Sequence, residues 1–228
     1  MPAKKTAPRR RTEKSFRMGW GKVCNHNEYM NIDSITIRKA AEEDRYGIAR
    51  CIAEGFEKDF SCFSRNPEKV AAAIAPGIVP GRFHVAEADN EIIATAAVSD
   101  NSGRAVYTDA MALRRNFGLL AGVFARLVLK PEFEGVLSFP SGTGYIEFVA
   151  VKARYRRKGV ASALLSECMK TGEYKDYVLD ALAGNDRAVE CYRKLGFREY
   201  ARDKKCGPHA KVYMRMDMPA VEQNSRTD

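Results

Sequence analysis

An apolar stretch leads through a basic turn into a helical pattern in residues 145–165, and this order limits the folds that the chain can adopt. Residues 145–151 are apolar apart from one glutamate, and residues 154–158 contain four cations. Gly159 then opens an apolar helical pattern that extends to Leu165. Such a pattern predicts a buried strand, a tight turn and a helix, which together begin a crossover between parallel strands.

The start of this helix predicts an anion-binding site. The first backbone N–H groups of a helix have no intrahelical partner and together carry about half a positive charge. Gly159 lacks the Cβ that would hold an anion away from them, and Arg156, Arg157 and Lys158 add charge just before the helix. A diphosphate suits this arrangement. On these residues alone, a solvated basic turn is the alternative.

A second motif lies downstream, in residues 179–197. A strand pattern over 177–182 is followed by Asn185, which can cap a helix, and by a helical pattern over 186–195. Gly196 supplies the positive φ angle that ends such a helix. We expect the strands of the two motifs to be parallel neighbours.

Together the two motifs resemble those of the Gcn5-related N-acetyltransferases (GNAT). Arg156, Gly159 and Ala161 occupy the Arg/Gln, Gly and Gly/Ala positions of the pyrophosphate-binding pattern of that family. The positions of the second motif are filled by Asn185, Ala188, Tyr192, Leu195, Gly196 and Phe197. The resemblance covers residues 32–218 and implies an α/β fold with a mixed central sheet flanked by helices.

The remaining patterns fit this fold, with an extra helical insertion between the third and fourth strands. We expect strands at 34–38, 82–88, 91–99, 145–151, 177–182, 197–202 and 210–218. Helices are expected at 41–56, 67–74, 113–129, 158–171 and 186–195. The insertion is the helix at 113–129, followed by an expected loop from Pro131 to Gly144. Such a helix either roofs an active site or only covers one face of the sheet.

Charge separates a basic tail from a nearly neutral body. Residues 1–22 hold eight Lys/Arg and one acid, whereas the remainder holds 30 basic and 28 acidic residues. We expect a disordered tail over 1–31, a single acetyltransferase domain over 32–219 and a frayed end over 220–228. The neutral body disfavours nucleic-acid binding except through the tail.

Cysteine and histidine spacing indicates neither disulfides nor a metal site. The six cysteines form no CxxC pair, and the three histidines show no zinc-ligand spacing. We therefore expect reduced thiols, no metal and a cytoplasmic protein. No stretch reaches the ~18 consecutive apolar residues of a membrane span, and no apolar segment of a secretory signal follows the basic start.

The resemblance implies acetyl-CoA as co-substrate, with its diphosphate at the helix start. The residues implied to bind it there are Arg156, Arg157, Lys158, Gly159, Val160, Ala161 and Ser162. Asn185 either reaches the ligand or only caps its helix. In the family, the strand matching 145–151 splays from its parallel neighbour at a bulge, and the backbone of Val149, Ala150 and Val151 would pair with the pantetheine arm.

Three side chains are candidates for acid–base chemistry. The resemblance implies that Tyr192 protonates the departing thiolate; otherwise it is a core tyrosine. Glu147 shares a face with Val149 and Val151 if strand alternation is unbroken. Asp180 stands where N-terminal alanine acetyltransferases of the family carry a glutamate, and its shorter side chain favours a water relay. The base stays open between Glu147, Asp180 and water chains or other groups, since either carboxylate can simply pair with a Lys or Arg.

The expected activity is N-acetyl transfer from acetyl-CoA by direct attack in a ternary complex, with a primary amine of a small molecule or a peptide as acceptor. In the family the acceptor is selected by segments that correspond to residues 55–66 and 203–211 of this chain. The alternative is a noncatalytic acyl-CoA-binding regulatory module, which keeps the anion site but lacks a competent base. The sequence predicts no oligomeric state.

Overall fold

The computed structural model describes residues 35–170, 173–204, 207 and 209–219. The chain divides into two units, residues 1–32 and 33–228, and every described residue belongs to the second. The expected tail over 1–31 and the expected frayed end over 220–228 therefore lie outside the described residues.

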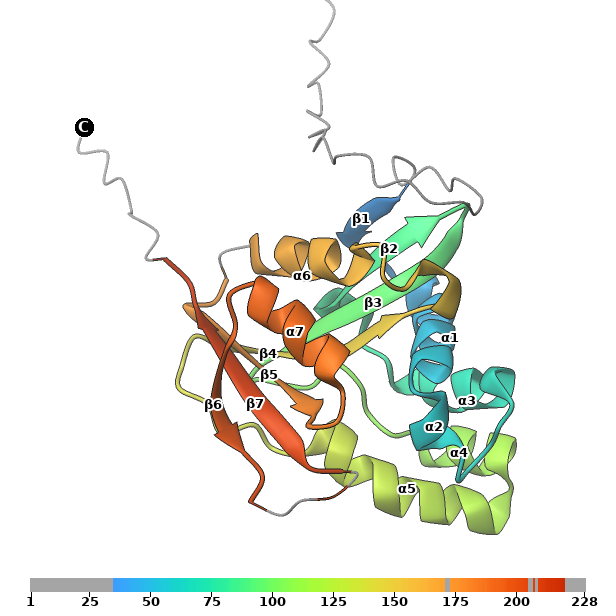
Figure 1. Cartoon of the computed structure of the whole chain (residues 1–228). Coiled ribbons are helices and arrows are strands. Elements are labelled where there is room, and N and C mark those ends of the chain that lie inside the picture. Colours follow the sequence, from blue (N-terminus) through green and yellow to red (C-terminus); the bar gives the residue numbers. More distant parts are fainter. Residues whose placement is uncertain (1–34, 171–172, 205–206, 208, 220–228) are drawn as a thin grey trace, which may run out of the picture. The chain divides into compact units, whose positions relative to one another are not determined.

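The described residues form a seven-stranded mixed sheet (Figure 1). Its strands are β1 (Thr36–Lys39), β2 (Phe83–Ala88), β3 (Glu91–Ser99), β4 (Thr143–Val151), β5 (Asp176–Leu182), β6 (Arg198–Arg202) and β7 (Lys211–Asp217). They lie in the order β1-β2-β3-β4-β5-β7-β6. Only β4 and β5 are parallel among these neighbours. The predicted mixed sheet and its predicted parallel pair are confirmed.

Helices cover both faces of this sheet (Figure 1). They are α1 (Arg45–Gly55), α2 (Glu57–Phe60), α3 (Pro67–Ile74), α4 (Ala110–Phe117), α5 (Leu119–Glu134), α6 (Val160–Lys170) and α7 (Asp186–Lys194). Two clusters of buried hydrophobic residues form the core. On one face of the sheet, α1, α3, α4 and α5 pack against the strands, and on the other face α6 and α7 do so. None of the helices in the described part is long and apolar enough to span a bilayer.

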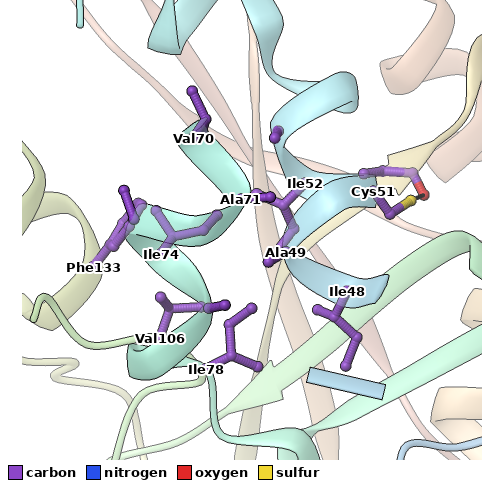
Figure 2. Packing of buried hydrophobic residues seen from close by; sticks show 14 of the residues in the cluster. Ile48, Ala49, Cys51, Ile52, Val70, Ala71, Ile74, Ile78, Val106 and Phe133 are labelled. Carbon is purple, nitrogen blue, oxygen red and sulfur yellow. Dashed lines mark hydrogen bonds between the residues drawn. The ribbon is translucent and has the colours of Figure 1, made fainter. Parts of the chain in front are cut away.

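The first of these clusters shows why the sequence periodicity produces helices here. Ile48 and Ile52 on α1, and Val70 and Ile74 on α3, recur at four-residue spacing and are buried against each other (Figure 2). Burying each such side chain contributes about 1.5–3 kcal/mol. Phe133 of α5 closes the same cluster (Figure 2).

The segment between β3 and β4 folds into two helices, where the sequence predicted one. Gly118 separates them, because its φ of 94° is accessible mainly to glycine. Asp109 caps α4 by accepting a hydrogen bond from the Ala112 N–H at 2.7 Å.

The predicted loop from Pro131 was wrong at its beginning. Pro131 lies inside α5, and the helix continues to Glu134. A proline so close to the end of a helix removes one hydrogen bond without preventing the last turn. That turn is held by Phe133, whose ring centroid lies 5.3 Å from that of Phe148 on β4.

The end of α1 approaches β4 so closely that only glycine fits. A Cβ added to Gly55 would lie 2.6 Å from the Cβ of Ala150. The absence of this side chain sets the distance between α1 and the second half of β4.

We predict that Gly55→Ala lowers the free energy of unfolding by about 1–3 kcal/mol, because the added methyl overpacks the contact with Ala150. This loss exceeds the gain of up to about 1 kcal/mol in helix propensity. Urea denaturation measures the change. Gly81→Ala is the matched control, since an added Cβ there meets no atom within 4 Å. Equal stability of Gly55→Ala and wild type would contradict the prediction.

Candidate active site

Strands β4 and β5 pair over only the first part of their length. Parallel pairing runs from Thr143↔Asp176 to Ile146↔Leu179, whereas the strands continue to Val151 and Leu182. Beyond Ile146, the edge of β4 on the β5 side has no strand partner within the described residues. The two strands therefore diverge where the sequence resemblance placed a splay.

A bulge in β4 accompanies this divergence. Phe148 has a φ of 52°, a left-handed conformation that is rare for a bulky residue, and the β3–β4 register shifts between Thr95 and Ala97. The Thr95 hydroxyl donates to the Phe148 carbonyl at 3.1 Å. The Phe148 ring lies among aromatic neighbours, 5.3 Å from Phe133 and 6.2 Å from Phe83 between centroids. These contacts offset a backbone strain of about 1–3 kcal/mol.

Beyond the bulge, the main chain of β4 directs N–H groups into the gap that opens between β4 and β5. Lys152 donates its N–H to the Ile93 carbonyl of β3 at 2.9 Å. Because N–H directions alternate along a strand, those of Val149 and Val151 point to the opposite edge, where β5 has diverged. Ala150 is turned toward β3, where it pairs with Thr95. An extended ligand can therefore pair with Val149 and Val151.

The basic turn is attached to the end of β4. The Arg156 Nε donates to the Val151 carbonyl at 2.8 Å. Arg157 and Gly159 both have positive φ angles, 64° and 79°. An added Cβ on Gly159 would meet no atom within 4 Å, so the space beside it is open.

The predicted anion site at the start of α6 has free donors and unpaired cations. The N–H groups of Val160, Ala161 and Ser162 form the first turn of α6 and have no acceptor among the described residues. The side chains of Arg156, Arg157 and Lys158 are exposed, and no described carboxylate forms an ion pair with them. Backbone donors and side-chain charge thus gather at one helix start.

Glu147 is buried and has several donors. Its carboxylate accepts from Arg104 Nη2 at 2.5 Å, from the Ala105 N–H at 3.2 Å and from the Ser99 hydroxyl. The expected shared face with Val149 and Val151 is not found, because the bulge breaks the alternation: those two valines pack on the α6 side of the sheet.

Arg104 links this carboxylate to the end of α5. It donates to the carbonyls of Glu132 and Gly135 at 3.0 and 2.8 Å. Burial disfavours its charge, but the adjacent Glu147 outweighs burial and raises the pKa of Arg104. The ion pair between Arg104 and Glu147 therefore joins the insertion to the bulged strand.

Asp180 follows the last β4–β5 pair by one residue. It accepts from the Tyr145 hydroxyl and forms an ion pair with Lys211 Nζ at 3.2 Å. Lys211 also lies 3.7 Å from a carboxylate oxygen of Glu132 on α5. Burial would lower the pKa of Lys211, but Asp180 and then Glu132 raise it. Both candidate bases are thus paired with a cation, as the alternative expectation stated.

Tyr192 lies on α7 in the cluster on the α6 side of the sheet. It is 7% exposed, and its ring centroid is 6.1 Å from that of Phe197. Burial, with smaller effects of Cys191 and Asp180, raises the pKa of its phenol. The hydroxyl therefore keeps its proton at neutral pH.

Both ends of α7 are formed as predicted. The Asn185 side chain accepts from the Ala188 N–H at 3.2 Å and caps the helix. Gly196 has a φ of 104° just after the helix end.

The sequence did not identify Arg104, and although the resemblance implied a bulge in this strand, nothing in the sequence placed it at Phe148. Arg104 is a single cation in an irregular segment, and its partner Glu147 is 43 positions away. A phenylalanine gives no local signal for a positive φ angle. Lys211 falls within the segment 203–211 that was expected to select the acceptor, but its ion pair with Asp180 was not foreseen.

Two cavities of the described chain lie outside this gap. One of about 310 Å³ is lined by Lys39, Arg82, His84 and Tyr174, among others, and one of about 560 Å³ lies along α5. Within the part of the chain that the structure describes, no group of three or more His, Cys, Asp or Glu side chains is placed to hold a metal ion.

Known proteins share this arrangement of strands and helices. A model of the acetyltransferase (GNAT) family matches residues 52–197. An N-acetyltransferase from Staphylococcus aureus Mu50 aligns with a TM-score of 0.55 at 18% identity, covering 79% of this chain and 100% of that one. The ribosomal-protein-S18-alanine N-acetyltransferase from Escherichia coli aligns with a TM-score of 0.50 at 15% identity, covering 83% and 97%. These two likenesses concern the fold alone. No curated protein sequence matches the chain.

We predict that Arg104→Met lowers the free energy of unfolding by about 3–5 kcal/mol, because it leaves Glu147 buried without its cation. The double variant Arg104→Met/Glu147→Leu loses less, since no buried charge remains. Chemical denaturation of the four proteins of the cycle measures both changes. Lys194→Met, which breaks an exposed ion pair on α7, is the control and leaves the unfolding curve unchanged. An Arg104→Met protein with the free energy of unfolding of wild type would show that buried Glu147 does not need the ion pair with Arg104.

Proposed function

Because this chain belongs to the acetyltransferase (GNAT) family, we propose that it is an N-acetyltransferase that moves the acetyl group of acetyl-CoA to a primary amine. The observation that carries the proposal is the gap between β4 and β5, which lies next to an open, basic helix start. The two features suit the two parts of one ligand, an extended pantetheine arm and a diphosphate.

In this proposal the start of α6 binds the diphosphate. The unpartnered N–H groups of Val160, Ala161 and Ser162 donate to it, and Gly159 leaves room for its approach. Arg156, Arg157 and Lys158 add charge-assisted hydrogen bonds. Asn185 mainly caps α7, and any contact of its side-chain amide with the ligand comes second to this role.

The open edge of β4 would hold the thioester end of acetyl-CoA. When bound, acetyl-CoA supplies an activated acetyl thioester. The N–H groups of Val149 and Val151 pair with the extended arm and stabilise negative charge on the thioester oxygen. Ala150 is not assigned this role, because its main chain pairs with β3.

We assign the base to Asp180, acting through water, in preference to Glu147. Asp180 lies at the point where β5 leaves β4, and its bonds to Tyr145 and Lys211 leave lone pairs free for a further donor. Glu147 already accepts from Arg104, Ala105 and Ser99 and sits on the other side of the bulge. Glu147 is therefore a positioning residue in this proposal.

Tyr192 completes the proton balance. The amine nitrogen forms a bond to the carbonyl carbon, the carbon–sulfur bond breaks, and the proton lost by the amine passes to water and Asp180. Tyr192, whose raised pKa keeps it protonated, returns a proton to the sulfur. Bulk water then reprotonates the Tyr192 phenolate and takes up the proton held by Asp180, which resets both groups.

A panel of primary amines and peptides tests the proposed activity. We predict release of free CoA thiol with at least one amine in the panel. Gly159→Asp abolishes most of it, because the carboxylate blocks the anion site and repels phosphate. Isothermal calorimetry with acetyl-CoA separates binding from turnover, and Gly159→Asn is the matched control that keeps the bulk without the charge. Tight binding without thiol release for every amine favours the noncatalytic module. Unchanged affinity in folded Gly159→Asp would refute the placement of the anion site.

We predict that Tyr192→Phe lowers kcat by ~10²–10⁴-fold with little change in acetyl-CoA affinity, because it removes only the O–H. Tyr177→Phe is the control: it also removes a buried hydroxyl, which donates to the Cys168 carbonyl at 3.5 Å, and should retain kcat. Equal kcat for folded wild type and Tyr192→Phe, measured where chemistry limits the rate, would eliminate the acid role.

A further inference from the structure

The outer side of α5 presents an apolar surface that no other described element covers. Figure 1 shows α5 along the lower edge of the described fold. Leu120 is 85% and Leu127 72% exposed. The exposed apolar residues of the helix are Leu119, Leu120, Val123, Phe124, Leu127 and Val128. Its inner side is also apolar, because Ala125, Leu129 and Phe133 pack into the core. A helix that is apolar on both sides ordinarily has a partner on each.

Positive charge lines a groove beside this surface. The cavity of about 560 Å³ has the apolar residues Val123, Leu127, Pro131 and Val136 among its lining, together with Arg114, Arg126 and Lys130. No carboxylate of the described chain forms an ion pair with any of these three cations. The one acid of the lining, Glu134, accepts from the Thr108 N–H at 2.8 Å and lies within electrostatic reach of Lys130 and Arg126. One carboxylate facing three cations leaves the groove positive.

The charge decides which occupant suits the groove. A second copy of the chain would bring cations against cations. Residues 1–22, with eight Lys/Arg, have the same unfavourable sign, and residues 220–228 contain only one large apolar residue, Val221. A lipid surface would contact the protruding leucines but would leave the groove unfilled, whereas a helix can lie along the groove and bring carboxylates to the cations that line it.

We propose that α5 and its groove dock an acidic amphipathic helix of a protein partner. The partner would place apolar side chains at i, i+3, i+4 and i+7 on the exposed stripe and carboxylates against Arg114, Arg126 and Lys130. The 16 residues of α5 span about 24 Å, enough to contact three to four turns of such a helix.

This docking surface adjoins the proposed active site. The Phe124 ring centroid lies 5.9 Å from that of Phe63, in the segment 55–66, and Glu132 lies 3.7 Å from Lys211 at the start of β7. A partner on α5 is therefore held beside both segments expected to select the acceptor. The docking itself does not depend on acetyl transfer.

Two designed peptide probes test the proposal with the full-length protein. Both are labelled 16-residue helices with the same leucine stripe, one flanked by glutamates and the other by lysines. Fluorescence anisotropy should give at least ~10-fold tighter binding of the glutamate peptide, and this binding should weaken as salt rises. Leu127→Ser should weaken it by ~10-fold or more. Arg126→Glu combined with Lys130→Glu should reverse the preference between the two peptides.

Matched controls and alternative occupants make the test decisive. Tyr200→Ser removes an exposed apolar side chain from β6 and should bind the glutamate peptide like wild type. Equal affinity for the two peptides, or full binding by folded Leu127→Ser, would overturn the proposal. A self-association in sedimentation that Leu127→Ser abolishes would assign the face to a second copy. Co-sedimentation with phosphatidylserine/phosphatidylcholine vesicles, without peptide binding, would assign it to a membrane. Either result also overturns the proposal.

Discussion

The left-handed backbone of Phe148 is the constraint on which the candidate site depends. It interrupts the regular alternation of β4 just after the last pair with β5, so the two strands separate while both continue. A backbone of this kind persists only where its surroundings hold it. Here a hydrogen bond from Thr95 and the rings of Phe83 and Phe133 hold it, and Phe133 belongs to the inserted helix α5. The insertion and the gap are therefore one structural unit.

Two ion pairs tie the same unit together and give the two candidate bases different surroundings. Glu147 is buried against Arg104, which also binds the end of α5, whereas Asp180 pairs with Lys211 at the mouth of the gap. A buried ion pair adds little net stability. It nevertheless fixes the positions of both side chains, because a buried charge without its partner destabilises the fold. This difference is why we assign Glu147 a positioning role and propose Asp180 for proton transfer.

The sequence predicted what is local and missed what depends on distant contacts. The strand, basic turn and glycine-opened helix lie within one stretch, and Asn185 and Gly196 signal the ends of α7 by their own chemistry. The conformation of Phe148 has no such signal, since it arises from Thr95 and aromatic rings of other elements. The predicted helix end before Pro131 was wrong for the same reason, because packing of Phe133 stabilises the last turn of α5 beyond the proline.

In the proposed complex, one ligand spans the open edge of β4 and the start of α6. Backbone amide exchange by NMR, with and without acetyl-CoA, measures this placement, because the amides of Val149, Val151 and Val160 to Ser162 have no described partner to protect them. We expect acetyl-CoA to slow exchange at these amides, while exchange at the Ala150 amide, which is already paired with β3, stays the same. Saturating acetyl-CoA that leaves exchange at Val149, Val151 and the α6 start unchanged would contradict it.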